Sequence, residues 1–172
     1  MKKILLIMML LLSFVSVAFA KTPPGFYNMK DGSRFGLGGL RPLMTYEQVE
    51  KIYGSATEAY RSKKAIDNGL YEAPYYKWEI HYGKTVKLEL VQLANSNRLT
   101  LLLIESTGNN GWKTPDGLTV GMKEEMIEKT LGKAYRVEHK KNQYFYNWES
   151  WSMVFTVQNG VITKIVCVAR EE

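Results

Sequence analysis

Hydrophobic and polar residues alternate along several stretches of the chain, and this alternation predicts antiparallel strands. Residues 76–82 carry apolar side chains at the even positions, and residues 86–90 follow the same rule. A period of two is typical of a sheet with one covered face and one open face. On this register the side chains that point to the open face are polar, and they include Lys77, Glu79, His81 and Lys87.

Two-residue turns and further β-rich stretches complete the predicted strands. Gly83-Lys84 is one turn, and Asn159-Gly160 is the stronger signal because both residues tolerate positive φ. A β-branched run at 161–168 predicts the last strand, and residues 134–139 predict a short strand before the one near Tyr144. We expect about eight strands in total.

Two short amphipathic helices are predicted, each ended by a glycine. In the first, Thr45 and Gln48 form a capping box, and Val49, Ile52 and Tyr53 make the apolar face. In the second, Glu124 and Glu125 favour the helix start. Its buried face consists of Ile127, Thr130 and Leu131, and Gly132 ends it.

The two helix regions belong to an internal repeat. Residues 39–56 align without gaps to residues 117–134, and eight of the 18 pairs are identical, where roughly one is expected by chance. A second match joins residues 76–79 to residues 146–149, both of which read Tyr-x-Trp-Glu. Duplication of one unit is the simplest explanation.

The repeat predicts how the chain is divided. We expect a signal peptide at 1–20, an N-terminal segment at 21–34, one repeat at 35–106, a linker at 107–117 and a second repeat at 118–172. Each repeat supplies one helix and one antiparallel meander. The predicted fold class is therefore α+β, with one curved sheet of about eight strands and the helices on one face.

The second half should mirror the open face of the first. By the same register Phe145, Asn147 and Glu149 point outward, and Trp151 and Met153 either continue that surface with Phe155 or belong to the core. A slip of one residue would reverse this choice. Aromatic and methionine side chains on an open sheet are suitable interface anchors. The candidate partner-binding residues are Lys77, Glu79, His81, Lys87, Phe145, Asn147, Glu149, Trp151 and Met153.

Other aromatic residues are better explained by packing. Tyr76/Tyr146 and Trp78/Trp148 recur in both repeats, and recurrence in a duplicated unit favours a place in the core. Trp112 lies in a turn-rich linker, where we expect it to plug the junction between the repeats.

The first 20 residues indicate export. Lys2 and Lys3 precede a 14-residue apolar run, and Ala18-Phe19-Ala20 fits a signal-peptidase site, so cleavage is expected near Ala20/Lys21. The run is short for a spanning helix, so the mature chain should have no membrane span. The protein is thus expected to be secreted or periplasmic. Its only cysteine, Cys167, lies in the β-branched run and is predicted to be a core residue.

Composition argues against several functional classes. The net charge is +6, without a dense block of Lys and Arg, so nucleic acid is a poor candidate partner. His81 and His139 have no cysteine or carboxylate at metal-ligand spacing, and no serine lies in a nucleophile elbow. The glycines at 36–39 favour a flexible loop over a phosphate site. We expect no catalytic residues, metal or cofactor.

The repeated stretch 117–132, Gly-Leu-Thr-Val-Gly-Met-Lys-Glu-Glu-Met-Ile-Glu-Lys-Thr-Leu-Gly, resembles the helix signature of the β-lactamase inhibitory proteins and of the small SmpA/OmlA outer-membrane assembly lipoproteins. The tandem arrangement is similar to that of the β-lactamase inhibitory proteins, which implies a concave binding face and no catalysis. The chain departs from those inhibitors because it has one cysteine and carries Gly83-Lys84-Thr85 where they carry an acidic hairpin.

These observations predict an exported, non-enzymatic protein-binding module. The resemblance implies an inhibitor of a β-lactamase or of another extracytoplasmic enzyme that occludes its target with the sheet. One alternative is a cell-envelope assembly or structural protein, and another is a binder of cell-wall fragments or small molecules.

Overall fold

The computed structural model describes residues 32–169, which form one antiparallel sheet and its helices. The predicted signal peptide and most of the 21–34 segment lie outside the described residues. The elements along the chain are η1 (Gly32–Arg34), α2 (Tyr46–Tyr53), β1 (Glu58–Arg61), β2 (Tyr75–Tyr82), β3 (Val86–Leu93), β4 (Leu99–Ser106), α3 (Glu125–Leu131), β5 (Arg136–Glu138), η2 (His139–Lys141), β6 (Gln143–Trp148), β7 (Trp151–Gln158) and β8 (Val161–Ala169).

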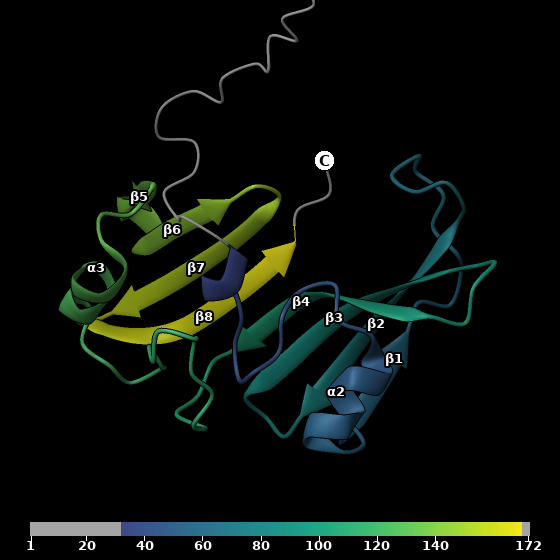
Figure 1. Ribbon diagram of the computed structural model, residues 1–172, viewed down its shortest axis with the longest axis horizontal. Coiled ribbons are helices and arrows are strands. Elements are labelled where there is room, and N and C mark those ends of the chain that lie inside the picture. The colour runs from purple at the N-terminus through teal and green to yellow at the C-terminus, as the bar shows by residue number, and fades with distance from the viewer. Residues whose placement is uncertain (1–31, 170–172) are drawn as a thin grey trace, which may run out of the picture.

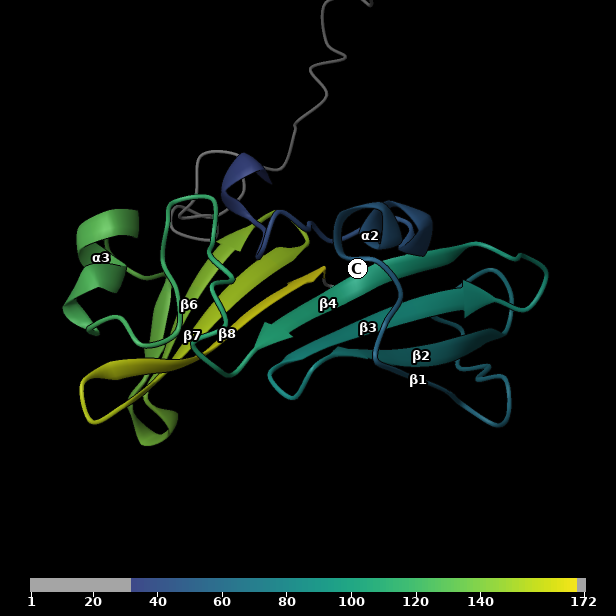
Figure 2. The same ribbon diagram turned by 90° about the horizontal axis from the view of Figure 1, so that it is seen from below.

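The sheet has eight strands in the order β1-β2-β3-β4-β8-β7-β6-β5 (Figure 1). Each helix precedes four consecutive strands, and the last strands of the two sets, β4 and β8, meet in the middle. Figure 2 shows α2 and α3 on the same side of the sheet. The α+β class, the eight-stranded sheet and the two helices predicted from the sequence are confirmed.

Only part of β4 pairs with β8. Residues 103–106 pair with residues 165–168, whereas Leu101 exchanges backbone hydrogen bonds with Leu43 (2.6 Å) and Met44 (2.8 Å). In the other half, Ile162 of β8 makes the corresponding pair of bonds with Gly121 and Met122, both 2.8 Å. The segment that leads into each helix is thus attached to the sheet, which fixes where that helix begins.

Local signals explain most of α2. The capping box is confirmed, because Gln48 N donates to Thr45 Oγ1 (3.4 Å) and Thr45 N donates to Gln48 Oε1 (2.9 Å). Val49 is fully buried, but Ile52 is 51% exposed, so its predicted place on the buried face is wrong. The buried face follows Tyr46, Val49 and Tyr53, and at about 100° per residue Ile52 lies roughly a quarter-turn away from it.

Helix α3 places Ile127 and Leu131 in the core as predicted, while Thr130 is half-buried. Both helices end at glycines with positive φ, 72° at Gly54 and 81° at Gly132. The carbonyls of these glycines accept hydrogen bonds from tyrosine hydroxyls, Tyr82 to Gly54 (2.9 Å) and Tyr146 to Gly132 (2.8 Å).

These bonds correct one sequence alignment. Tyr82, not Tyr76, occupies the position in β2 that Tyr146 occupies in β6. The strand pairing agrees with this. His81, which precedes Tyr82, is opposite Glu58 of β1, and Phe145, which precedes Tyr146, is opposite Arg136 of β5. The shared Tyr-x-Trp-Glu letters therefore occupy different places in their strands. Tyr146 is nevertheless fully buried, as predicted, whereas Tyr76 is only half-buried.

The core lies between the sheet and the helices. Alternate residues of the strands point into it, including Ile80, Leu88, Leu90, Leu101 and Ile104 from the first half and Tyr146, Phe155, Ile162, Ile165 and Cys167 from the second. The burial of Cys167 is confirmed. The residues before α2 also contribute, because Phe35, Leu37 and Leu40 are fully buried. The expectation of a flexible loop at 36–39 is wrong, since Leu37 and Leu40 also pair their backbones.

Trp112 fills the junction between the halves, as predicted. It is 8% exposed and stacks on Tyr53, with ring centroids 4.4 Å apart. Gly38 lies against both rings, donates its backbone N–H to Lys113 O (2.9 Å) and accepts a hydrogen bond from the Tyr53 hydroxyl. The linker, the segment before α2 and the helix itself therefore meet at one aromatic contact.

The lack of a side chain at Gly38 should be essential to this contact. A Cβ there would lie 2.5 Å from the Trp112 ring and 2.6 Å from the Tyr53 hydroxyl, whereas a Cβ at Gly39 meets no atom within 4 Å. Both residues have positive φ, 63° and 78°, so alanine costs about 1 kcal/mol of backbone strain at either position. Gly38→Ala should cost about 1–3 kcal/mol more because of the clash.

Urea unfolding followed by tryptophan fluorescence would measure the two free energies, with Gly39→Ala as the matched control. Equal losses in the two variants would contradict this account of the junction.

Candidate functional site

The strand register divides the sheet into a face covered by the helices and an open face on the other side. The odd positions of β2 and β3 point to the open face. The residues that pair with them across β4, β8, β7 and β6 point to the same face. The side chains on the open face include Lys77, Glu79, His81, Lys87, Glu89, Leu103, Glu105, Lys164, Val166, Val168, Ser152, Val154, Phe145 and Asn147.

The first half of the open face is charged from Lys77 to His81 on β2 and from Lys87 to Glu89 on β3, whereas Tyr75 and Val91 at the other end of the same face are buried. Lys77 and Glu79 are exposed, and His81 and Lys87 are half-buried, so the predicted register of β2 and β3 is confirmed. We call Glu79, His81, Lys87, Glu89 and Glu105 the charged cluster. Its basic side chains pair within their own strands, with His81 Nε2 2.8 Å from Glu79 Oε1 and Lys87 Nζ 2.9 Å from Glu89 Oε1. The hydrogen bond that Lys87 donates to Glu89, together with the surrounding carboxylates, raises the pKa of Lys87, although desolvation lowers it.

Two carboxylates of this cluster face each other across neighbouring strands. Glu79 of β2 is directly opposite Glu89 of β3, and like charges in such a position destabilise a sheet. A hollow of about 460 Å³ opens beside them, lined by Tyr60, Arg61, Ser62, Lys77, Trp78, Glu79 and Glu89.

The open face also carries apolar side chains, which lie among polar ones on β4, β8, β7 and β6. Leu103, Phe145, Val154, Val166 and Val168 form what we call the apolar strip, and all five are half-buried. Phe145 faces outward as predicted, with the Arg136 guanidinium 4.1 Å from its ring centroid. The sequence did not identify the valines, because residues 161–168 are apolar on both faces and alternation could not separate outward from inward positions.

Three of the predicted partner-binding residues require correction. Met153 is fully buried on the covered face, opposite Tyr146 and Cys167. Trp151 has the same register, is half-buried and packs edge-on against Phe35 (6.2 Å) and Trp148 (5.6 Å). Asn147 does point to the open face but is only 3% exposed, and its Oδ1 accepts a hydrogen bond from Ser152 Oγ (2.7 Å).

Glu149 also differs from its predicted position. Strand β6 ends at Trp148, and Glu149 lies in the following turn with a φ of 49°. It is exposed but is not part of a strand face. The register could not be extended that far because a two-residue turn joins β6 to β7. Glu149 and Glu79 are consequently not equivalent positions.

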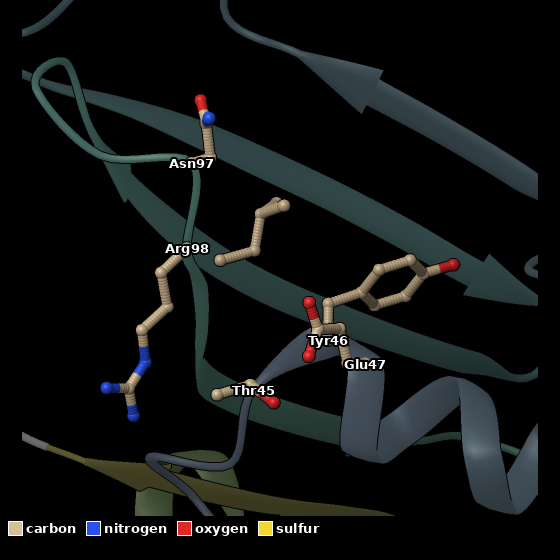
Figure 3. A pocket seen from close by; sticks show the side chains of 6 residues that line it. Thr45, Tyr46, Glu47, Asn97 and Arg98 are labelled. Atoms are coloured by element: carbon tan, nitrogen blue, oxygen red, sulfur yellow. The ribbon is translucent and has the colours of Figure 1, made fainter.

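A larger hollow lies beside the start of α2 and offers no evident chemistry. It measures about 510 Å³ and is lined by Thr45, Tyr46, Glu47, Asn97, Arg98 and Leu99. Figure 3 shows the Arg98 guanidinium directed away from Tyr46 and Glu47. Glu47 already places a negative charge in the first turn of the helix, which removes the attraction of this end for an anion.

Within residues 32–169, no group of three His, Cys, Asp or Glu side chains is arranged to hold a metal ion. No helix in that range is long and apolar enough to cross a membrane.

Comparison with known proteins does not assign a family. No protein-family model matches the chain, and no curated protein matches it. Among solved structures, it is similar to a cysteine-rich secretory protein (SAV1118) of Staphylococcus aureus, with 12% identity over 76% of this chain and a TM-score of 0.47. It is also similar to a DUF4309 family protein (YjgB) of Bacillus subtilis, with 16% identity, 77% of this chain and 83% of that chain covered, and a TM-score of 0.41. The match spans 45% of the staphylococcal chain, and neither similarity carries a functional conclusion.

The two faces of β7 should respond differently to truncation. Met153→Ala removes a fully buried side chain and should lower the free energy of unfolding by about 2–5 kcal/mol. Val154→Ala changes a half-buried residue on the open face and should cost about 1 kcal/mol or less. Chemical denaturation monitored by circular dichroism would compare them, and similar losses would argue against the assigned faces.

The thiol of Cys167 should be unreactive in the folded protein. Burial raises its pKa to about 12, so almost no thiolate exists near neutral pH. We expect a thiol-reactive disulfide reagent to label Cys167 at pH 8 only after unfolding in urea.

A double variant, Cys167→Ala with Val166→Cys, provides the control because it moves the thiol by one residue to the open face. It should react in the folded state. Rapid labelling of native wild-type protein would show that Cys167 is not enclosed.

Proposed function

We propose that the chain is an exported, non-enzymatic protein-binding module whose open sheet face covers the surface of a partner. The observation that carries this proposal is the apolar strip, five half-buried side chains on the face away from the helices. Apolar groups that are contiguous and exposed mark interaction surfaces more often than ordinary solvent-facing sheet. The charged cluster beside the strip resembles the polar surroundings of an interface core.

The proposal includes descent of the two halves from one duplicated unit, as repeats at 35–106 and 118–172. The repeated segment 39–56/117–134 supports it, and so do the paired backbone bonds of Leu101 and Ile162 to residues 43–44 and 121–122. The bonds of Tyr82 and Tyr146 to the glycines that end α2 and α3 add a third correspondence. Joining two such units at β4 and β8 gives an open face twice as wide as one unit offers.

In its most specific form the proposed activity is inhibition of an extracytoplasmic enzyme, a β-lactamase in particular, by occlusion. The open face would cover the rim of the active site without chemistry of its own. The hairpin between β2 and β3 carries Gly83, Lys84 and Thr85 at its tip, so insertion of an acidic residue is not part of this mechanism. Affinity would come from the area covered by the sheet.

Purified mature protein should be assayed against several serine β-lactamases. The proposed inhibitor acts at nanomolar concentration, and Val154→Arg should weaken inhibition at least about tenfold because it places a charge in the middle of the apolar strip. Ile52→Arg is the matched control, since Ile52 is 51% exposed on the helix side of the sheet, and it should leave inhibition unchanged.

Failure to inhibit any of these enzymes at high micromolar concentration would eliminate the β-lactamase version. Crosslinking in the host from a photoreactive residue at position 154 or 52 would then test the general proposal. A partner captured from position 154 alone supports the open face, and its identity as a soluble enzyme or as envelope-assembly machinery separates inhibitor from scaffold. Capture from position 52 alone would refute the proposal.

A further inference from the structure

Leu43 occupies a backbone position that does not favour a leucine. The turn before α2 is closed by a hydrogen bond from Met44 N to Arg41 O (3.3 Å), and its third residue, Leu43, has a φ of 71°. A positive φ at this place is typical of a type II turn, which favours glycine. The equivalent turn before α3 has the same hydrogen bond (3.3 Å) but has Gly121 in the third place, with a φ of 97°. Leu43 therefore carries a backbone strain that the second half avoids.

Burial does not explain why a leucine is kept there. Leu43 is 50% exposed, and it lines a hollow of about 310 Å³ at the end of the open face away from the charged cluster. The strands contribute Val91, Leu93 and Leu102 to this hollow, and Tyr71 adds an aromatic ring. Concave sites lined mainly by aliphatic and aromatic side chains are typical of small-molecule pockets, and this volume lies at the small end of their range.

Tyr71 comes from a loop that the second half lacks. Residues 62–74 join β1 to β2, whereas only residues 139–142 join β5 to β6. The long loop is attached to the sheet, because Ile66 exchanges backbone hydrogen bonds with Tyr75 (2.7 and 2.9 Å) and the Tyr71 ring packs edge-on against Tyr75 at 4.7 Å. Two features by which the first half differs from the second thus meet at one hollow, one of them strained. Local conflicts of this kind are expected at functional sites.

The charge at the hollow is positive. Arg98 is the charged residue that lines it, and among residues 32–169 no carboxylate forms an ion pair with its guanidinium. Figure 3 shows that guanidinium directed away from Glu47. Lys77 is directly opposite Val91 in the sheet, while Glu72, which follows Tyr71 in the loop, is not part of the lining. An unpaired guanidinium beside an apolar hollow suits a carboxylate that is attached to an apolar group.

We infer that this hollow binds a small monocarboxylate, whose apolar chain or ring lies against Leu43 and Tyr71 and whose carboxylate pairs with Arg98. The inference goes beyond the proposed function, because it requires no protein partner and does not involve the apolar strip.

Titration of the mature protein with hexanoate, octanoate and phenylacetate would test the inference, with the leucine and valine methyl groups followed by NMR. Binding should shift the methyl signals of Leu43, Val91, Leu93 and Leu102. The alcohol analogue of the tightest ligand should bind more weakly, and the amine analogue more weakly still, because Arg98 repels a cation. If none of the three carboxylates shifts these signals at millimolar concentration, the inference is wrong.

Leu43→Gly separates binding from stability. It should weaken the tightest carboxylate about tenfold, because it removes an apolar wall of the hollow. The midpoint of urea unfolding should stay about the same, since relief of the positive φ offsets the lost partial burial. Ile52→Ala is the matched control, because it removes an equally exposed apolar side chain (51%) from α2, and it should not change binding. Wild-type affinity in Leu43→Gly would contradict the assigned site.

Arg98→Gln tests the role of the charge. It should weaken the carboxylate about threefold to fivefold, since an exposed ion pair is screened by solvent, and leave the alcohol analogue unchanged. Arg41→Gln removes an exposed arginine that does not line this hollow and is the matched control. No loss in Arg98→Gln, or an equal loss for the carboxylate and the alcohol, would refute the carboxylate assignment. Val154→Arg should leave carboxylate binding intact, so this site and the proposed function can fail separately.

Discussion

Four residue pairs between β4 and β8 join the two halves into one sheet, and they align the covered and open faces of one half with those of the other. Leu103 faces Val168 and Ile104 faces Cys167, so the open face of one half continues into the open face of the other and the two cores join beneath the helices. The pairing is short because Leu101 and Ile162 pair instead with the segments that precede the helices. The same constraint therefore positions the sheet and the helices that cover it.

Polar groups of buried and half-buried residues are accommodated by specific partners. The hydroxyls of Tyr82 and Tyr146 bind the glycine carbonyls at the helix ends, and Ser152 binds Asn147. Between the halves, Arg34 joins η1 to the linker through Asp116 (2.9 Å) and to α3 through the carbonyl of Thr130 (3.2 Å). Together with the Tyr53–Trp112 stack, these contacts fix the chain segments that cross the junction. The open face has a different character, because no helix within residues 32–169 covers its apolar strip and two of its carboxylates oppose each other.

Local signals predicted the parts of this structure that local interactions control. The capping box at Thr45, the glycine helix ends and the Asn159-Gly160 turn each depend on the backbone preferences of a few residues, and all are present. Alternation in β2 and β3 assigned Lys77, Glu79 and His81 to the open face because their strands are polar on one side only. In β7 the odd positions are apolar and the even positions are polar except for Val154, whereas in β8 both sides are largely apolar. The sequence analysis left open whether Trp151 and Met153 face outward or belong to the core, and the structure places them on the covered face.

The sequence by itself determined the element types, the two helix-and-meander units and the polar open face of the first unit, since periodicity and turn chemistry are properties of neighbouring residues. Only the tertiary structure decided which side of β7 faces the helices, that Tyr82 rather than Tyr76 corresponds to Tyr146, and that an apolar strip continues the charged cluster. These features depend on pairing between residues far apart along the chain. A shift of one position in such a pairing exchanges the two faces while leaving every local pattern unchanged.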